Sequence, residues 1–151
     1  MNILAFDLGT KTGWASRGSS FTYSGTLNLA NKRHEGGGMR YLKFRNELVE
    51  LFQTRIDAVY YEEVRRHAGT DAAHVYGGLL AVLTVECEKR EIPYSGVPVG
   101  TIKKHWTGKG NADKAAMIAE AHRRGFCAED DNEADALALL DWACQELRIT
   151  R

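Results

Sequence analysis

Acidic residues interrupt hydrophobic segments at three places in this sequence of 151 residues, and the first is Asp7. It ends an apolar run that starts at Asn2, and it precedes Gly9, whose backbone can approach a phosphate closely. An ionised carboxylate in a core is costly unless a metal ion, a basic partner or a shifted pKa accompanies it. Asp7 is therefore a candidate metal ligand; the competing interpretation is that it caps the turn between Gly9 and Gly13.

Glu62 is the second candidate, because it follows the hydrophobic residues Val59–Tyr61. If the strand ending at Asp7 and the strand ending at Glu62 lie side by side, both carboxylates reach the same edge of the sheet. The helical segment between them allows the right-handed crossover that this arrangement needs. Side chains alternate along a strand, so Glu63 points to the opposite face and only one of the two glutamates can join Asp7.

The third acidic position lies on a helix expected near the C-terminus. Asp131 and Asp135 are four residues apart and Asn132 and Asp135 three apart, so either pair shares one helix face. Acids so placed repel one another unless a cation lies between them, although acids at a helix start also interact favourably with the helix dipole. Asp135 is the stronger candidate, since the alanines at 134 and 136 surround it.

Three or four carboxylates without a histidine or cysteine cluster form a set of hard oxygen ligands. Such a set selects Mg²⁺, with Mn²⁺ as a substitute, over zinc. Two ions about 3.5–4 Å apart can hydrolyse a phosphodiester, one by activating water and the other by stabilising the leaving 3′ oxygen. The acids therefore predict a metal-dependent nuclease, in which Asp7 bridges the ions.

The formal net charge is zero, which alone argues weakly against a nucleic-acid partner. The charges are nevertheless segregated along the chain, because a basic strip spans residues 100–114 whereas residues 129–135 carry five acids and no base. The strip contains Lys103, Lys104, His105, Lys109 and Lys114 against a single acid, Asp113. A basic strip that offsets DNA charge beside acids that bind cations suits a metal nuclease; two solvated surfaces of opposite charge are the alternative.

Hydrophobic periodicity predicts one mixed α/β domain over residues 1–151 rather than a strict βαβ repeat. The expected strands are 2–8, 13–16, 21–29, 58–61 and 92–97. The expected helices are 39–54, 70–89, 99–106, one that opens at Asn111 or Asp113 and is ended by Gly125, and 132–147. Thr70 or Asp71 is expected to cap the second helix. The glycine pair Gly77-Gly78 inside that helix indicates close approach of another backbone, such as that of a partner subunit.

The remaining composition argues against other protein classes. The three cysteines are far apart and form no CxxC pair, so neither a disulfide framework nor a zinc site is expected, and a reducing cytoplasm fits best. The N-terminal apolar run is too short for a signal peptide or a membrane span, so no membrane partner is expected.

Four segments resemble RuvC-type Holliday junction resolvases, particularly the short forms found in phages. The segments occur in the family's order and together cover nearly the whole chain. They are FDLGTKTGWA at 6–15, YEEV at 61–64, GKGNADK at 108–114 and DNEADALA at 131–138. The resemblance implies a ribonuclease H-like fold: a mixed five-stranded sheet, with three antiparallel strands followed by parallel strands, flanked by helices.

The same resemblance implies a homodimer that uses Mg²⁺ to introduce paired nicks into a four-way DNA junction. It also implies a location in the cytoplasm, which would be the host cytoplasm if the protein is phage-encoded. It assigns the catalytic, metal-binding acids to Asp7, Glu62 and Asp135. It also makes Lys103, Lys104, Lys109 and Lys114 candidate phosphate contacts, with Lys109 or Lys114 nearest the scissile phosphate.

Two positions depart from the family pattern. Asn132 stands where the family usually has Asp or His, so either Asp131 supplies a fourth catalytic carboxylate or Asn132 binds metal through its carbonyl oxygen. Arg65, followed by Arg66, stands where some members have an aromatic wedge that enters the junction. The two arginines can bind phosphates or stack on bases, which would suit a nuclease of broader branched-DNA or flap specificity.

Two other functional classes compete with the nuclease. Asp7-Leu8-Gly9-Thr10 also resembles the phosphate loop of actin-like and sugar-kinase ATPases, but those proteins enclose a nucleotide between two lobes, and 151 residues supply one. A DNA-binding protein that keeps the fold without catalysis is disfavoured, because all three principal carboxylates are present.

Overall fold

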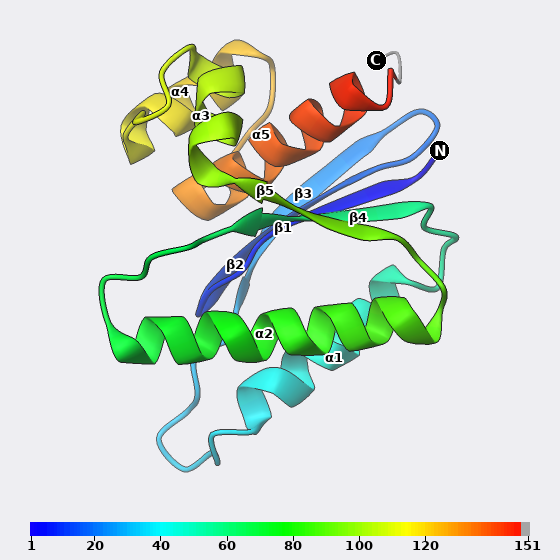
Figure 1. Ribbon diagram of the computed structural model, residues 1–151, viewed down its shortest axis with the longest axis vertical. Helices are drawn as coiled ribbons and strands as arrows, with labels where there is room; N and C mark the ends of the chain where they lie inside the picture. Colours follow the sequence, from blue (N-terminus) through cyan, green and yellow to red (C-terminus); the bar gives the residue numbers. More distant parts are fainter. Residues whose placement is uncertain (149–151) are drawn as a thin grey trace.

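The computed structural model describes residues 1–148, which form five strands and five helices around one sheet (Figure 1). In chain order these are β1 (Ile3–Asp7), β2 (Lys11–Arg17), β3 (Thr22–Asn28), α1 (Met39–Leu51), β4 (Ala58–Glu63), α2 (Thr70–Lys89), β5 (Tyr94–Pro98), α3 (Val99–Thr107), α4 (Lys114–Arg123) and α5 (Asp131–Glu146). The mixed α/β order predicted from the periodicity is confirmed. No helix within the described residues is long and apolar enough to cross a membrane.

The sheet has the strand order β3-β2-β1-β4-β5. The strands β1, β2 and β3 form an antiparallel meander, whereas β4 and β5 run parallel to β1. The parallel pairing sets Phe6 opposite Tyr61, so the ends of β1 and β4 reach the same edge of the sheet. The antiparallel pairing sets Asp7 opposite Gly13.

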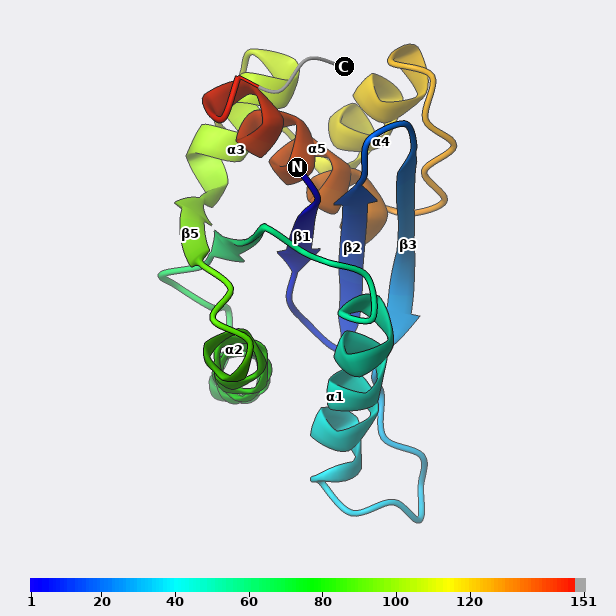
Figure 2. The same ribbon diagram turned by 90° about the vertical axis from the view of Figure 1, so that its right-hand side faces the viewer.

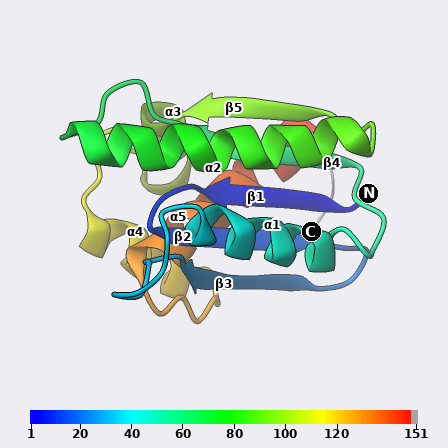
Figure 3. The same cartoon turned by 90° about the horizontal axis from the view of Figure 1, so that it is seen from below.

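Helices cover both faces of the sheet, as the view along it shows (Figure 2). α1 and α2 run side by side across one face, where Leu4 and Phe6 point into a hydrophobic cluster (Figure 3). α3, α4 and α5 cover the other face, where Ile3 and Ala5 point. Adjacent residues of β1 thus serve opposite cores, which is why the strand is hydrophobic without alternation.

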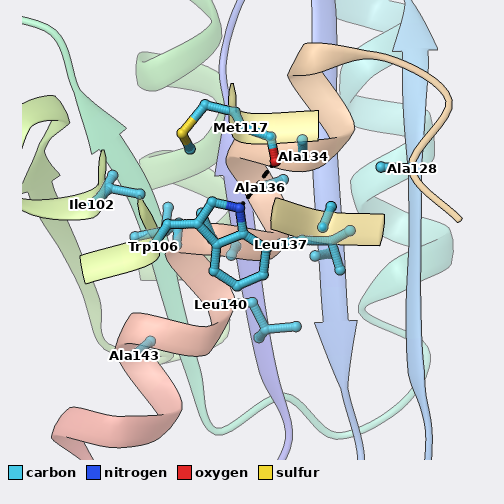
Figure 4. Close-up of a cluster of buried hydrophobic side chains, with 14 of the residues drawn as sticks. Ile102, Trp106, Met117, Ala128, Ala134, Ala136, Leu137, Leu140 and Ala143 are labelled. Carbon is cyan, nitrogen blue, oxygen red and sulfur yellow. Dashed lines mark hydrogen bonds between the residues drawn. The ribbon is translucent and has the colours of Figure 1, made fainter. Parts of the chain in front are cut away.

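The core beneath α5 is built around Trp106 of α3 (Figure 4). Its indole Nε1 donates a hydrogen bond of 3.1 Å to the carbonyl oxygen of Met117 in α4. The alanines of α5 face this core and let the helix approach the sheet closely. α3, α4 and α5 are consequently packed as one unit above β1 and β2.

Asp130 is the N-cap of α5, and its carboxylate accepts hydrogen bonds from the Glu133 backbone N–H and from the Thr26 hydroxyl, both at 2.8 Å. Its first turn lies directly on β2 at Gly13. A Cβ atom at Gly13 would stand well inside van der Waals distance of the Asn132 carbonyl group. Gly13 is therefore required by the closeness of two backbones.

The expected cap of α2 was wrong, and the close approach expected at Gly77-Gly78 is found within this chain only at Gly78. Neither Thr70 nor Asp71 caps it; the N-cap is Gly69, without a side-chain hydrogen bond. Gly78 does allow a close approach, but its neighbour is the Tyr41 ring of α1 in the same chain rather than a backbone, and a Cβ atom at Gly77 would meet nothing within 4 Å. The low helix propensity of glycine predicted a close neighbour but could not identify it, and packing of a partner subunit at Gly77 stays a prediction.

Gly13→Ala is expected to lower the free energy of unfolding by about 1–3 kcal/mol, the usual cost of overpacking a tight contact. The new methyl group must push α5 away from β2. Urea denaturation measures the change. Gly36→Ala is the control, because a Cβ atom at Gly36 would meet nothing within 4 Å. Equal stability of the two variants would show that the contact at Gly13 is not tight.

Candidate metal site

Three carboxylates from three elements converge at one end of the sheet. Asp7 ends β1, Glu62 lies near the end of the parallel strand β4, and Asp135 lies on the second turn of α5. One oxygen atom from each lies within 4.8 Å of the other two. The structure therefore brings together the three principal acids predicted from the sequence.

The site is poorly solvated, and this changes the acidity of its members. Burial, followed by the charges of Glu62 and Asp135, raises the pKa of Asp7 well above its ordinary value. Burial also raises the pKa of Glu62, which the charge of Lys103 partly opposes. Burial and the Glu62 charge raise the pKa of Asp135 to about 7. Without a counter-charge, the three acids resist simultaneous ionisation.

The geometry and chemistry of these acids fit a divalent cation. The Oδ1 atom of Asp135 is buried, and it has no hydrogen-bond partner among residues 1–148. A buried acceptor without a donor costs free energy, as does repulsion among clustered carboxylates. A hard cation bound by oxygen atoms would remove both costs, and an all-carboxylate set is typical of Mg²⁺ and Mn²⁺ sites.

The two candidates for a fourth ligand, Asp131 and Asn132, both lie on the first turn of α5. Asp131 is outside the group of oxygens within 4.8 Å, and its carboxylate lies 3.5 Å from Lys114 Nζ. Its charge nevertheless raises the pKa of both Asp7 and Asp135. Asn132 lies in the first turn of α5, where its backbone carbonyl packs against Gly13. Neither residue is part of the three-acid group.

Glu129, Asp130 and Glu133, which share the acidic segment, have other roles. One oxygen of Glu133 accepts a hydrogen bond of 2.7 Å from the Ser24 hydroxyl, and the other accepts one of 2.9 Å from the Glu129 backbone. Asp130 caps α5. Of the five acids in this segment, Asp135 alone joins the cluster.

Basic residues surround the site unevenly. Lys103 lowers the pKa of Glu62 and Asp135, and Lys114 lowers that of Asp135, so their charges reach the cluster. Lys104 and Lys109 are exposed, and neither is among the main causes of these shifts. Lys109 and Lys114 were the lysines expected nearest the scissile phosphate. Of these, Lys114 lies near the acids, and Lys103, which was not given that place, also lies near them.

Arg65 and Arg66 are exposed in the loop that follows β4. The Nε atom of Arg65 lies 3.5 Å from Glu63, a pair open to solvent and therefore weak. This loop and α3 begin at the same sheet edge, because β4 and β5 are parallel neighbours (Figure 1). The loop with the arginines and the helix with Lys103 and Lys104 therefore both begin at the end of the sheet that carries the acids.

Sequence reasoning missed two residues that shape the backbone around the acids. The buried Thr12 hydroxyl donates a hydrogen bond of 2.7 Å to the Gly9 carbonyl, closing the turn after Asp7. The Tyr76 hydroxyl donates one of 2.8 Å to the Glu62 carbonyl. A threonine in a turn is a local signal, but Tyr76 carried none, because its partner Glu62 lies on another element, 14 residues earlier in the sequence.

Neither a protein-family model nor a curated relative matches this sequence. Solved structures do match. T. thermophilus RuvC in complex with a Holliday junction substrate superimposes with a TM-score of 0.73 at 20% identity, covering 92% of this chain and 90% of that one. A second T. thermophilus RuvC structure gives a TM-score of 0.71 with the same identity and coverage.

The yeast mitochondrial Holliday junction resolvase Ydc2 matches with a TM-score of 0.59 at 15% identity, covering 91% of this chain and 75% of that one. These likenesses agree with the strand order and with the resemblance found in the sequence. The chain has the ribonuclease H-like fold of the RuvC resolvases.

Proposed function

We propose that this protein is a Mg²⁺-dependent endonuclease of a single domain that cuts branched DNA and resolves four-way junctions. The observation that carries the proposal is the convergence of Asp7, Glu62 and Asp135, with oxygens within 4.8 Å, at the end of a RuvC-like sheet. Function is argued from this site, since the fold alone supports many activities.

The three acids would hold the divalent ions, with Asp131 or Asn132 as the additional ligand on the first turn of α5. When bound, two divalent cations supply an activated water and stabilise the leaving 3′ oxygen. The chain's own contribution is to fix the acids from three rigid elements and to limit access of bulk water to Asp7 and Glu62. Rigid placement of this kind orients the scissile phosphate.

The DNA backbone would be held by cations on both sides of the acids. Lys103, Lys104, Lys109 and Lys114 form one group, and Arg65 and Arg66 form the other. Phosphate contacts of this kind position the nucleic acid without reading its sequence. Two exposed arginines in place of an aromatic wedge also support a second candidate, a branched-DNA or flap nuclease without strict junction selectivity.

Paired nicks in opposite strands need two active sites, and we propose that a homodimer supplies them. The exposed face of α2 is a suitable surface, because Gly77, Ala81 and Val85 recur there at helical spacing. Val85 is 51% exposed, and Gly77 leaves open space above the helix. A second copy of α2 could pack closely on this face.

Asp7→Asn is expected to abolish Mg²⁺-dependent nicking of a synthetic four-way junction while DNA affinity is unchanged. The amide keeps the size of the side chain but removes the charge that attracts the cation. Cleavage of four-way junction, flap, fork and linear duplex with Mg²⁺ and Mn²⁺ measures activity, and gel shift measures binding. Undiminished cleavage by the variant would refute the proposed mechanism, and equal cleavage of all branched substrates by the wild type would favour the broader nuclease.

The metal-free protein is expected to be more stable at pH 5.5 than at pH 8. The folded pKa of Asp135 is raised from 3.8 to about 7, so its protonation stabilises the fold below pH 4 and is lost as the pH rises through 7. Each unit of difference between the folded and unfolded pKa corresponds to about 1.4 kcal/mol. The contribution of Asp135 to the free energy of unfolding is therefore on the order of a few kcal/mol.

Thermal unfolding with and without Mg²⁺ tests this electrostatic account. Mg²⁺ should raise the melting temperature at pH 8 and have less effect at pH 5.5, where protons compete for the carboxylates. Asp135→Asn should make the metal-free protein more stable at pH 8 and remove most of the Mg²⁺ effect. If the melting temperature of the metal-free wild type rose from pH 5.5 to pH 8, the electrostatic account would be contradicted.

Lys103→Ala and Lys104→Ala separate general phosphate binding from an effect on the acids. Each is expected to weaken junction binding and to reduce the slope of log affinity against log salt by about one. Only Lys103→Ala should also lower kcat, because the Lys103 charge acts on Glu62 and Asp135. Single-turnover cleavage at saturating protein measures this difference, and equal kcat in both variants would place Lys103 with the distant contacts.

A further inference from the structure

The Tyr76 hydroxyl group lies between two backbone groups at the end of β4. It donates a hydrogen bond of 2.8 Å to the carbonyl oxygen of Glu62 and accepts one of 3.3 Å from the N–H of Val64. Tyr76 is only 8% exposed, and burial raises its pKa, so the hydroxyl stays protonated and able to donate. A side chain of α2 therefore fixes the backbone on which Glu62 is mounted.

The sheet supports this end of β4 from one side only. Pairing with β1 ends at Tyr61, opposite Phe6. Pairing with β5 continues through Glu62, opposite Val97, and ends at Glu63, opposite Pro98, which has no N–H to donate. Tyr76 thus provides hydrogen bonds where the pairing with β1 has ended, at the proposed metal ligand.

The same tyrosine contacts the loop between β4 and α2. The ring of His67 lies against the ring of Tyr76, with centroids 4.9 Å apart and planes inclined by 49°. His67 directly follows Arg65 and Arg66, the exposed arginines proposed to meet DNA. One side chain therefore touches both the backbone of Glu62 and the loop that carries the arginines.

We propose that Tyr76 is a positioning residue that couples this loop to Glu62, so that engagement of branched DNA by the loop sets the metal ligand in place. The inference rests on the proposed nuclease function and adds a regulatory contact to it. Tyr76 acts through the Glu62 backbone and does not itself touch the substrate. Partners that orient metal ligands commonly affect metal affinity or activity by about 10- to 100-fold.

A merely structural role for Tyr76 predicts a different pattern. A buried tyrosine that only fills the core can be replaced by phenylalanine with little change in packing. Loss of two hydrogen bonds at Glu62 and Val64 would instead loosen one specific point of the backbone. Tyr76→Phe is therefore the informative variant. Tyr94→Phe is its control, because the Tyr94 hydroxyl donates a hydrogen bond of 2.8 Å to the exposed Glu88, outside the site.

Four measurements on the full chain test the proposal. In the metal-free protein, amide hydrogen exchange at Val64 should be faster in Tyr76→Phe than in the wild type or in Tyr94→Phe. The rise in melting temperature caused by Mg²⁺ should be smaller in Tyr76→Phe, and half-maximal cleavage should need more Mg²⁺. On a four-way junction, kcat should fall by about tenfold or more while KM stays within about twofold.

The coupling has a separate test in His67→Ala, which alters a partly exposed loop residue and keeps the proposal testable even if Tyr76→Phe folds poorly. It should lower kcat on the junction, and the double variant should lose no more activity than Tyr76→Phe alone. The positioning role would be overturned if, in Tyr76→Phe, the amide of Val64 exchanged at the wild-type rate and Mg²⁺ raised the melting temperature as much as in the wild type. Additive losses in the double variant would overturn the coupling. A wild-type protein that does not cleave would refute the nuclease proposal, whereas the exchange and Mg²⁺ measurements would still decide the role of Tyr76.

Discussion

Repulsion among Asp7, Glu62 and Asp135 is the constraint that the rest of this structure must withstand. Their oxygens lie within 4.8 Å of one another. Burial raises the pKa of all three, and the charge of Glu62 further raises the pKa of Asp7 and Asp135, so the ionised acids oppose folding. No single element could hold them together. Two parallel strands supply two of the acids, and a helix pressed against the neighbouring strand supplies the third.

The two hydrophobic cores provide the free energy that offsets this repulsion. β1 contributes to both, because Leu4 and Phe6 face α1 and α2 while Ile3 and Ala5 face α5. Hydrogen bonds also tie α5 to β3, since Asp130 accepts one from the Thr26 hydroxyl and Glu133 accepts one from the Ser24 hydroxyl. Placing charge where it destabilises the fold is typical of functional sites, in which stability is sacrificed for activity.

The surrounding cations balance the acids only in part. Lys103 and Lys114 lower individual pKa values, yet the pKa of Asp135 still lies near 7 and that of Asp7 well above its ordinary value. A site with this residual negative charge and an unpaired buried oxygen is complementary to a divalent cation. In the proposed nuclease, the same lysines and the arginines after β4 would contact the DNA phosphates. The fold is shared with RuvC at 20% identity, so side-chain geometry carries the functional argument.

Local pattern was sufficient for much of the fold and for each acid separately. Asp7 and Glu62 stand at the ends of hydrophobic runs, and Asp135 lies among alanines, so their element types and positions follow from periodicity. Strand boundaries were less accurate: β2 spans Lys11–Arg17 rather than 13–16, because pairing with its neighbours extends the strand beyond its apolar residues.

Contacts between residues distant in sequence were decided only by the tertiary structure. Periodicity reports which face of an element is buried, but it does not identify what covers that face. The packing of Gly78 on Tyr41, the contact of Gly13 with Asn132 and the hydrogen bond from Tyr76 to Glu62 all depend on how elements meet. The sequence by itself determined which acids could bind a metal and on which elements they lie. The tertiary structure decided that three of them meet, that Asp131 stands beside them, and that Tyr76 supports one, because these facts depend on distances between elements.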